Sequence, residues 1–234
     1  MKLSVVIPTW NAAALLPSCL HALAEADEVV LADGGSTDDS VAIAKAHGAR
    51  IVTIARGRGI QLAAGAAAAT GDALLFLHAD TLLAPGWRAA ADQHLCKHPR
   101  RPACFTLALD DHAWQARLIE RGVAWRTRRL GLPYGDQGLL LTRALYDRTG
   151  GYRPLPLMED VDILRRLPPP IMLAPRATTS AERWRRDGWW ARSARNLSIL
   201  TLWQAGVSET RLATLYDRSR PASPWPRATE PPAK

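Results

Sequence analysis

The chain has 234 residues, 47% of them hydrophobic and 22% charged, so it can bury one sizeable core and has the composition of a globular protein. No run approaches the roughly 20 apolar residues that a membrane-spanning helix needs. The net charge of +8 is uneven, because residues 1–99 hold 7 Lys and Arg against 9 Asp and Glu, whereas residues 100–234 hold 23 against 13. We therefore expect the two halves to face different partners, with phosphates, a membrane surface or nucleic acid for the basic half.

The N-terminus imitates a secretory signal, but Pro8 and Asn11 limit its apolar run to residues 3–7, which we interpret as a first strand. The three cysteines are an odd number without metal-ligand spacing, which indicates reduced thiols. We expect a cytoplasmic protein, with peripheral contact to the inner face of the membrane as an open alternative.

The first half alternates short apolar runs with segments of helical spacing. Buried strands are predicted at residues 3–7, 28–32, 50–54 and 73–77, with helices at residues 12–24, 38–47, 61–70 and 85–96. This rhythm predicts an α/β fold with a doubly wound, mostly parallel sheet. No G-x-G-x-x-G follows the first strand, so the pattern is not the dinucleotide fingerprint.

Polar motifs follow each of these four strands, where ligands bind in open α/β sheets. They are Pro8-Thr9-Trp10-Asn11, Asp33-Gly34-Gly35-Ser36-Thr37-Asp38, Arg56-Gly57-Arg58-Gly59 and His78-Ala79-Asp80. Asp33 could accept from a ribose or base, or cap the next helix. The two arginines suit phosphate, and a solvated turn explains them equally well. Asp80 suits a divalent cation, or an Asx-type turn.

The second half continues with a strand at residues 103–109 and a helix at residues 114–129. The helix has a basic face formed by Arg117, Arg121, Arg126, Arg128 and Arg129. Such a face is most often solvated, and contact with a membrane or a polyanion is the alternative. Asp136 and Gln137 precede a strand at residues 139–142 and offer acceptors and donors for sugar hydroxyls, although a simple turn also explains Asp136.

Three acids lie within Met158-Glu159-Asp160-Val161-Asp162, a segment with the character of a first helical turn. A last strand is predicted at residues 171–174. Residues 183–190 are rich in Arg and Trp, and residues 189–203 predict an amphipathic helix that packs on the domain or lies at a membrane interface. Residues 219–234 are too rich in Pro for a core and are predicted to be a disordered tail.

The order of these motifs resembles the family-2 glycosyltransferases, which have the GT-A fold. The resemblance is close over residues 3–81, and within the family the chain looks most like small bacterial members associated with arsenosugar or radical-SAM gene neighbourhoods. It implies an inverting glycosyltransferase that uses a nucleotide-diphosphate sugar as donor and a divalent cation, Mn²⁺ or Mg²⁺.

The resemblance also implies roles for the first-half residues. Pro8, Trp10 and Asn11 would border the nucleotide and Asp33 would contact its base. Arg58 would lie near the diphosphate and Asp80 would bind the metal. The chain departs from the family at His78, where the family has an acid that usually meets ribose or water.

On the acceptor side, the resemblance implies that Asp136 and Gln137 lie beside the transferred sugar and that Asp160 is the catalytic base. Glu159 would support the substrate site from the neighbouring position. Arg183 and Trp184 resemble an Arg-Trp pair that closes the site in some members, although Ser180 stands where those members have Gln.

We therefore expect a catalytic domain at residues 1–182, with its nucleotide-binding half at 1–99 and its acceptor half at 100–182, a helical extension at 183–218 and the tail. The acceptor would be a small molecule or a lipid-linked hydroxyl, with membrane contact through the basic C-terminal region. Two alternatives are a sugar nucleotidyltransferase, for which the first loop lacks the usual Gly and Lys, and a basic nucleic-acid-binding module, which leaves the first-half acids unexplained.

Overall fold

The structure, a computed structural model, describes residues 1–218. It divides into two compact units, residues 1–180 and a C-terminal unit that begins at Ala181. The predicted end of the catalytic domain, residue 182, lies close to this division. The tail predicted at residues 219–234 lies outside the described residues.

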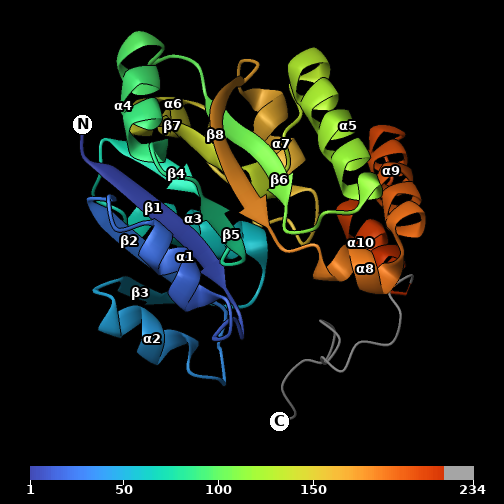
Figure 1. The fold of residues 1–234 in the computed structure, drawn as a ribbon. Coiled ribbons are helices and arrows are strands. Elements are labelled where there is room, and N and C mark those ends of the chain that lie inside the picture. Colours follow the sequence, from blue (N-terminus) through green and yellow to red (C-terminus); the bar gives the residue numbers. More distant parts are fainter. Residues whose placement is uncertain (219–234) are drawn as a thin grey trace. The chain divides into compact units, whose positions relative to one another are not determined.

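One eight-stranded sheet forms the centre of the first unit, in the order β3-β2-β1-β4-β7-β6-β8-β5 (Figure 1). The strands are β1 (Leu3–Thr9), β2 (Glu28–Asp33), β3 (Arg50–Thr53), β4 (Ala73–Phe76), β5 (Thr81–Leu83), β6 (Ala103–Leu109), β7 (Leu139–Thr142) and β8 (Ile171–Thr179). β1 is parallel to β2 and β4, β2 to β3, and β6 to β8. β7 is antiparallel to β4 and β6, and β5 to β8. The predicted α/β class with a mostly parallel sheet flanked by helices is confirmed.

These directions bring most strand ends to one edge of the sheet. β1, β2, β3, β4, β6 and β8 all end there, and the two reversed strands, β5 and β7, begin there. We call this the carboxyl edge. The segments that precede β7 and follow β4 therefore meet at the place where ligands bind in this architecture.

Helices cover both faces of the sheet (Figure 1). On one face lie α1 (Leu16–Ala22), α2 (Ser40–Ala46) and α4 (Trp87–Lys97), and on the other lie α3 (Arg58–Ala68), α6 (Arg143–Arg148) and α7 (Glu159–Arg166). A hydrophobic core lies on each face of the sheet: the first core under α1, α2 and α4, and the second under α3, α6 and α7. Side chains alternate along β1, so that Val5 and Ile7 point into the first core and Val6 points into the second. The longest helix, α5 (Trp114–Leu130), packs beside β6.

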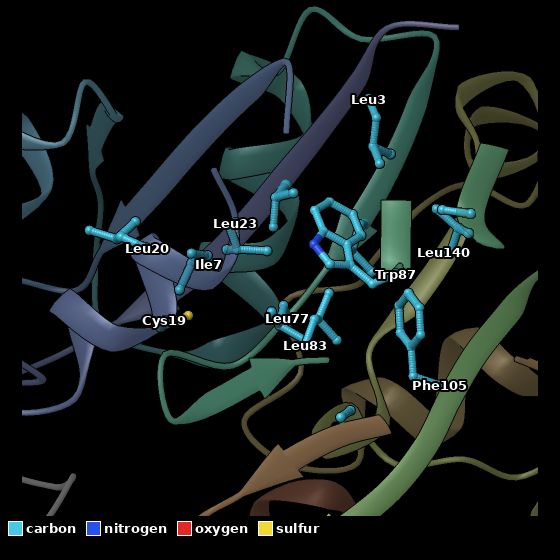
Figure 2. Close-up of a cluster of buried hydrophobic side chains, with 14 of the residues drawn as sticks. Leu3, Ile7, Cys19, Leu20, Leu23, Leu77, Leu83, Trp87, Phe105 and Leu140 are labelled. Atoms are coloured by element: carbon cyan, nitrogen blue, oxygen red, sulfur yellow. The ribbon is translucent and has the colours of Figure 1, made fainter. Parts of the chain in front are cut away.

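Trp87 is the largest fully buried side chain of the first core. Figure 2 shows its indole among Leu3, Leu23, Leu77, Leu83 and Leu140. Its Nε1 donates to the Ala22 carbonyl at 3.1 Å, so the polar atom of the ring is satisfied where the start of α4 meets the end of α1. The ring therefore joins α4 to α1 beneath the sheet without leaving an unpaired donor.

The last strand differs from its prediction. The sequence predicts a strand that ends at Ala174, because Pro175 cannot donate to a ladder. In the structure β8 continues to Thr179, and the register against β6 jumps from Phe105–Leu173 to Thr106–Arg176. The proline lies in this irregularity, and the Thr106 hydroxyl donates to the Leu173 carbonyl at 2.8 Å within it. β8 thus carries Thr179 to the carboxyl edge, where it pairs with the unpredicted strand β5.

The C-terminal unit contains α8 (Glu182–Asp187), α9 (Trp189–Gln204) and α10 (Glu209–Arg218). Asp187, at the junction of α8 and α9, has a side chain that is 1% exposed and accepts from Arg186 at 2.9 Å, Arg192 at 2.9 Å and Arg195 at 2.6 Å. Burial opposes its ionisation, but these hydrogen bonds and charges lower the pKa of Asp187 to about 2. Within residues 1–218, no helix is both long and apolar enough to cross a bilayer.

Replacement of Asp187 by Asn tests this ion cluster. Because the carboxyl pKa is lower in the folded chain, its contribution is full above about pH 4 and is lost as the pH falls toward 2. Asp187→Asn should cost about 2 kcal/mol of unfolding free energy at pH 7. Urea unfolding followed by circular dichroism measures this, with the exposed Asp147→Asn as matched control. An equal cost at pH 7 and pH 2.5 would contradict the linkage.

Candidate active site

The first two loops of the carboxyl edge are tied to each other. Asn11 has a left-handed backbone (φ 48°), and its Oδ1 accepts from the Thr37 amide at 2.8 Å. Asp33 is 2% exposed and accepts from the amides of Gly35 and Ser36, both at 3.0 Å, and from the Ser36 hydroxyl at 2.5 Å. The carboxylate therefore organises its own loop and does not cap the next helix, α2, whose N-cap is Asp39. Its contact with a base stays a prediction.

Gln61, which sequence reasoning missed, joins three of these loops. Its Nε2 donates to the carbonyls of Thr9 and Ala32, both at 2.8 Å, and its Oε1 accepts from the Gly57 amide at 3.2 Å. The side chain is 3% exposed. A glutamine within an Ala-rich helix was the available signal, because a buried amide needs several polar partners.

The two arginines of the third motif have different partners. The Arg56 guanidinium lies over the Trp10 ring, 3.5 Å from its centroid. Arg58 Nε lies 2.7 Å from Glu159 Oε1, with the Arg58 side chain 43% exposed. α3 begins at Arg58, earlier than predicted, so this ion pair joins the start of α3 to the start of α7.

Asp80, after β4, lines a cavity of about 130 Å³ together with Asp110 and Ser180. Within the described residues its carboxylate accepts one long hydrogen bond, from the Thr81 hydroxyl at 3.5 Å. Asp110 follows β6, and sequence reasoning missed it because a single acid after a strand has no distinctive spacing. The cavity thus presents two acids from separate strands at the carboxyl edge.

The turn that precedes β7 lies between the Asp80 and Asp160 segments. A side chain on Gly135 would meet the His78 ring, because a Cβ there would lie 2.5 Å from Nε2. The Gly135 amide donates to Asp160 Oδ2 at 3.2 Å. One glycine therefore contacts both the end of the β4 segment and the predicted base.

Asp136, the next residue, has a buried Oδ1 for which the described residues offer no hydrogen-bond partner. Burial raises the pKa of this carboxyl to about 6, the Arg126 cation opposes that rise, and the charges of Asp160 and Asp80 add to it. The three carboxylates are therefore close enough to act on one another. This orphaned oxygen is suited to a hydroxyl donor from a ligand.

Arg126 contacts this turn from α5. Its guanidinium lies over the Tyr134 ring, 3.6 Å from the centroid, and its Nε donates to the Leu132 carbonyl at 2.8 Å. The arginines of the predicted basic face therefore do not all point to solvent, since Arg126 turns toward Tyr134 and Asp136. Helical spacing alone did not distinguish this arginine from its solvated neighbours.

Gln137 differs from its expected role. It is 0% exposed, its Nε2 donates to the Phe105 carbonyl at 3.1 Å, and its Oε1 accepts from the Thr127 hydroxyl at 3.1 Å. The amide thus supports the turn from within the core and is not presented to a ligand, which corrects the expectation of a sugar contact.

The start of α7 concentrates negative charge. Met158, its N-cap, has a left-handed backbone (φ 65°). Glu159 is 1% exposed, and burial raises its pKa to about 7 although the Arg58 cation opposes this. Asp160 is half-buried, and its Oδ1 accepts from the Val161 amide at 2.8 Å. Glu159 is therefore a buried partner of Arg58, whereas Asp160 is open to solvent beside the turn.

Arg183 and Trp184 belong to α8 in the C-terminal unit. There the Trp184 ring stacks on Trp189 with 6.1 Å between centroids, and the Arg192 guanidinium lies 5.3 Å from the Trp184 centroid. Their expected role at the site stays a prediction.

The acids present suit a cation that is shared with a ligand. Among residues 1–218, no group of three or more His, Cys, Asp and Glu side chains could hold a metal ion. Mg²⁺ at phosphate-transfer sites is commonly bound by one or two carboxylates together with substrate phosphates, and Asp80 with Asp110 fits that donor set.

Comparisons with known proteins show which family the chain belongs to. The sequence profile described as "Glycosyl transferase family 2" matches residues 4–152, more than half of the chain. The chain belongs to this family of glycosyltransferases. Family membership makes the protein a transferase enzyme, as predicted from the motifs.

Two mycobacterial proteins are similar in sequence to parts of this chain. A "PGL/p-HBAD biosynthesis glycosyltransferase" of Mycobacterium tuberculosis is 41% identical over 97 residues, 34% of this chain and 36% of the relative, so the match spans about a third of that protein. An "uncharacterized glycosyltransferase" of the same organism is 32% identical over 171 residues, 66% of this chain and 76% of the relative.

Solved structures match the fold. Staphylococcus aureus TarS residues 1–349 has a TM-score of 0.62 at 16% identity and covers 92% of this chain and 69% of its own. A mannosyltransferase from Pyrobaculum calidifontis, in complex with GDP-Man and Mn²⁺, has a TM-score of 0.62 at 18% identity and covers 93% and 71%. The predicted GT-A fold of this family-2 glycosyltransferase is confirmed.

Glycine at position 59 is required by the close approach of α3 to the loop before α7. A Cβ there would lie 2.3 Å from the Arg153 carbonyl oxygen and 2.9 Å from the Leu155 amide nitrogen. Gly59→Ala should therefore destabilise the protein by about 1–3 kcal/mol.

The matched control is Gly122→Ala in α5, where a Cβ meets open space and should stabilise the helix by about 0.5–1 kcal/mol. Thermal unfolding of both variants makes the comparison. Equal stability of the two variants would contradict the packing argument.

Proposed function

We propose that this glycosyltransferase moves a sugar from a nucleotide-diphosphate sugar to an acceptor hydroxyl, with inversion at the anomeric carbon. Asp160 acts as the catalytic base, and Asp80 holds a divalent cation together with the donor diphosphate. The observation that carries the proposal is the Gly135–Asp136 turn. Gly135 lies against His78 and donates to Asp160, and the charges of Asp80 and Asp160 both raise the pKa of Asp136.

The base needs an available carboxylate in a fixed orientation. Two backbone amides, those of Gly135 and Val161, hold the two Asp160 oxygens at 3.2 and 2.8 Å, and the side chain remains partly exposed. An acceptor hydroxyl is a weak nucleophile, and a positioned base contributes about 10²–10⁴-fold to its reaction. Asp160 accepts the hydroxyl proton as the acceptor oxygen bonds to the anomeric carbon and the bond to the diphosphate oxygen breaks. Attack opposite the leaving group inverts the centre.

The leaving nucleoside diphosphate is the second requirement. When bound, the cation supplies charge neutralisation for the diphosphate. Mn²⁺ is present in the P. calidifontis complex with GDP-Man and in a glucosyl-3-phosphoglycerate synthase complex with UDP, which supports a cation and a nucleotide sugar here. Arg58, at the start of α3, and Arg56, two residues before it, would face the diphosphate from the same edge. Asp33 and the Pro8–Asn11 loop would hold the nucleobase and ribose of the donor nucleotide.

The acceptor side is assigned to the turn before β7. The unpartnered Asp136 Oδ1 would accept from a sugar or acceptor hydroxyl, and Arg126 with Tyr134 would form the wall beside it. Arg183 and Trp184 would close the site. The association with arsenosugar gene neighbourhoods, the cytoplasmic location and membrane contact through the C-terminal region remain predictions of the same kind.

Asp160→Asn tests the base. The amide keeps the shape of the carboxylate but cannot accept the proton, so transfer should fall by about 10²–10⁴-fold while binding of the nucleoside diphosphate changes little. Turnover of a matched donor and acceptor, measured as released nucleoside diphosphate, gives the first value, and calorimetry gives the second. The exposed Asp147→Asn is the control. Full activity in Asp160→Asn would sink the assignment, and release of pyrophosphate by the wild type would indicate nucleotidyl transfer instead.

Asp80→Asn tests the cation site. Ligand binding to the folded state raises its stability, so a nucleotide sugar should raise the melting temperature of the wild type more with Mn²⁺ than with EDTA. This Mn²⁺-dependent part of the shift should disappear in Asp80→Asn and persist in Asp147→Asn. A variant that keeps the full Mn²⁺-dependent shift would show that the cation binds elsewhere.

A further inference from the structure

The outward side of α5 is an unusual surface for a helix that supports an active site. Leu118 and Trp125 are 47% and 60% exposed and lie two helical turns apart on the same side. Arg121, Arg128 and Arg129 are exposed beside them. We call these five residues the outer stripe.

Charge on α5 is sorted between its two sides. Facing the domain, Arg117 pairs with Glu120 at 2.8 Å, and Glu120 accepts from the Leu109 amide at 2.7 Å. Within residues 1–218, the three arginines of the outer stripe make no ion pair or side-chain hydrogen bond, and the stripe contains no acid. The stripe therefore carries a net charge of +3 next to two large apolar side chains.

We propose that the outer stripe of α5 binds the surface of an anionic phospholipid bilayer. Arginines with tryptophan and leucine on one helical side form the composition that places a helix in the plane of a membrane interface. The guanidinium groups match the negative surface potential of anionic lipids, while Trp125 and Leu118 enter the boundary between head groups and acyl chains. A polynucleotide would match the charge but would leave Leu118 unused.

The opposite side of the same helix connects this surface to the acceptor turn. Thr127 donates to Gln137 at 3.1 Å, and Arg126 lies over Tyr134. A bilayer bound to the outer stripe would therefore lie one helix diameter from the turn. For the transferase, and resting on the proposed function, this favours an acceptor hydroxyl presented at the membrane surface over a freely diffusing one.

Vesicle binding tests the surface without use of the reaction. The full chain is sedimented with vesicles of phosphatidylcholine alone or with phosphatidylglycerol, and should bind the anionic vesicles selectively. The triple variant Arg121→Gln, Arg128→Gln, Arg129→Gln should bind them on the order of 100-fold more weakly. Leu118→Ser with Trp125→Ser should lose the part of the binding that survives high salt.

The matched control is the triple variant Lys97→Gln, Arg100→Gln, Arg148→Gln, which removes the same charge from exposed positions away from α5. It should retain binding within a few fold. Equal loss in both triple variants, undiminished binding in the outer-stripe variant, or binding of RNA in place of anionic vesicles would each overturn the proposal. Transfer to a soluble acceptor is measured separately for the same variants. An outer-stripe variant that loses vesicle binding but keeps this transfer shows that the membrane surface and the proposed function are tested independently.

Discussion

The hydrogen bond from the Gly135 amide to Asp160 joins the two parts of the chain on which the candidate site depends. Gly135 stands before β7, whose reversed direction brings its start to the edge where β4 ends. The same residue must lack a side chain because His78 occupies that space. The end of the β4 segment and the start of α7 are thus both held against one backbone position, Gly135.

The carboxylates of Asp80, Asp136 and Asp160 lie close enough to repel one another, and nearby arginines compensate this repulsion only in part. Arg126 opposes the rise in the pKa of Asp136, and Arg58 does the same for Glu159, yet both pKa values remain raised. An uncompensated negative charge of this kind favours binding of a cation or of hydroxyl donors. The electrostatics of the protein alone therefore agree with a site that is completed by its ligands.

The strands, their order of motifs and the acids at their ends could be predicted from the sequence, because buried runs and the polar residues that stop them are local signals. The hydrogen-bond partners of a side chain depend on tertiary packing and leave no local signal in the sequence. Gln61 and Gln137 are both buried amides, but the pattern pointed to Gln137 as a ligand contact and passed over Gln61. In the same way, only tertiary packing separates Arg126 from the outward arginines of α5, since all of them fit one helical period. Pro175 also hid the second half of β8, because the irregularity that accommodates it depends on β6.

Two residues with a strained backbone lie at the candidate site. Within the described residues, Asn11 and Met158 are the non-glycine residues with positive φ. Asn11 contacts the 33–38 loop through Thr37, and Met158 directly precedes Glu159. A left-handed backbone is costly for methionine, and such positions persist where the surrounding structure determines them. At Asn11 the amide oxygen offsets the cost by accepting from Thr37. At Met158 the side chain is buried, and the turn it forms starts α7 so that Asp160 faces Gly135. The strained residues therefore fix the backbone beside the 33–38 loop and at the start of α7, the two segments to which the proposed function assigns Asp33 and Asp160.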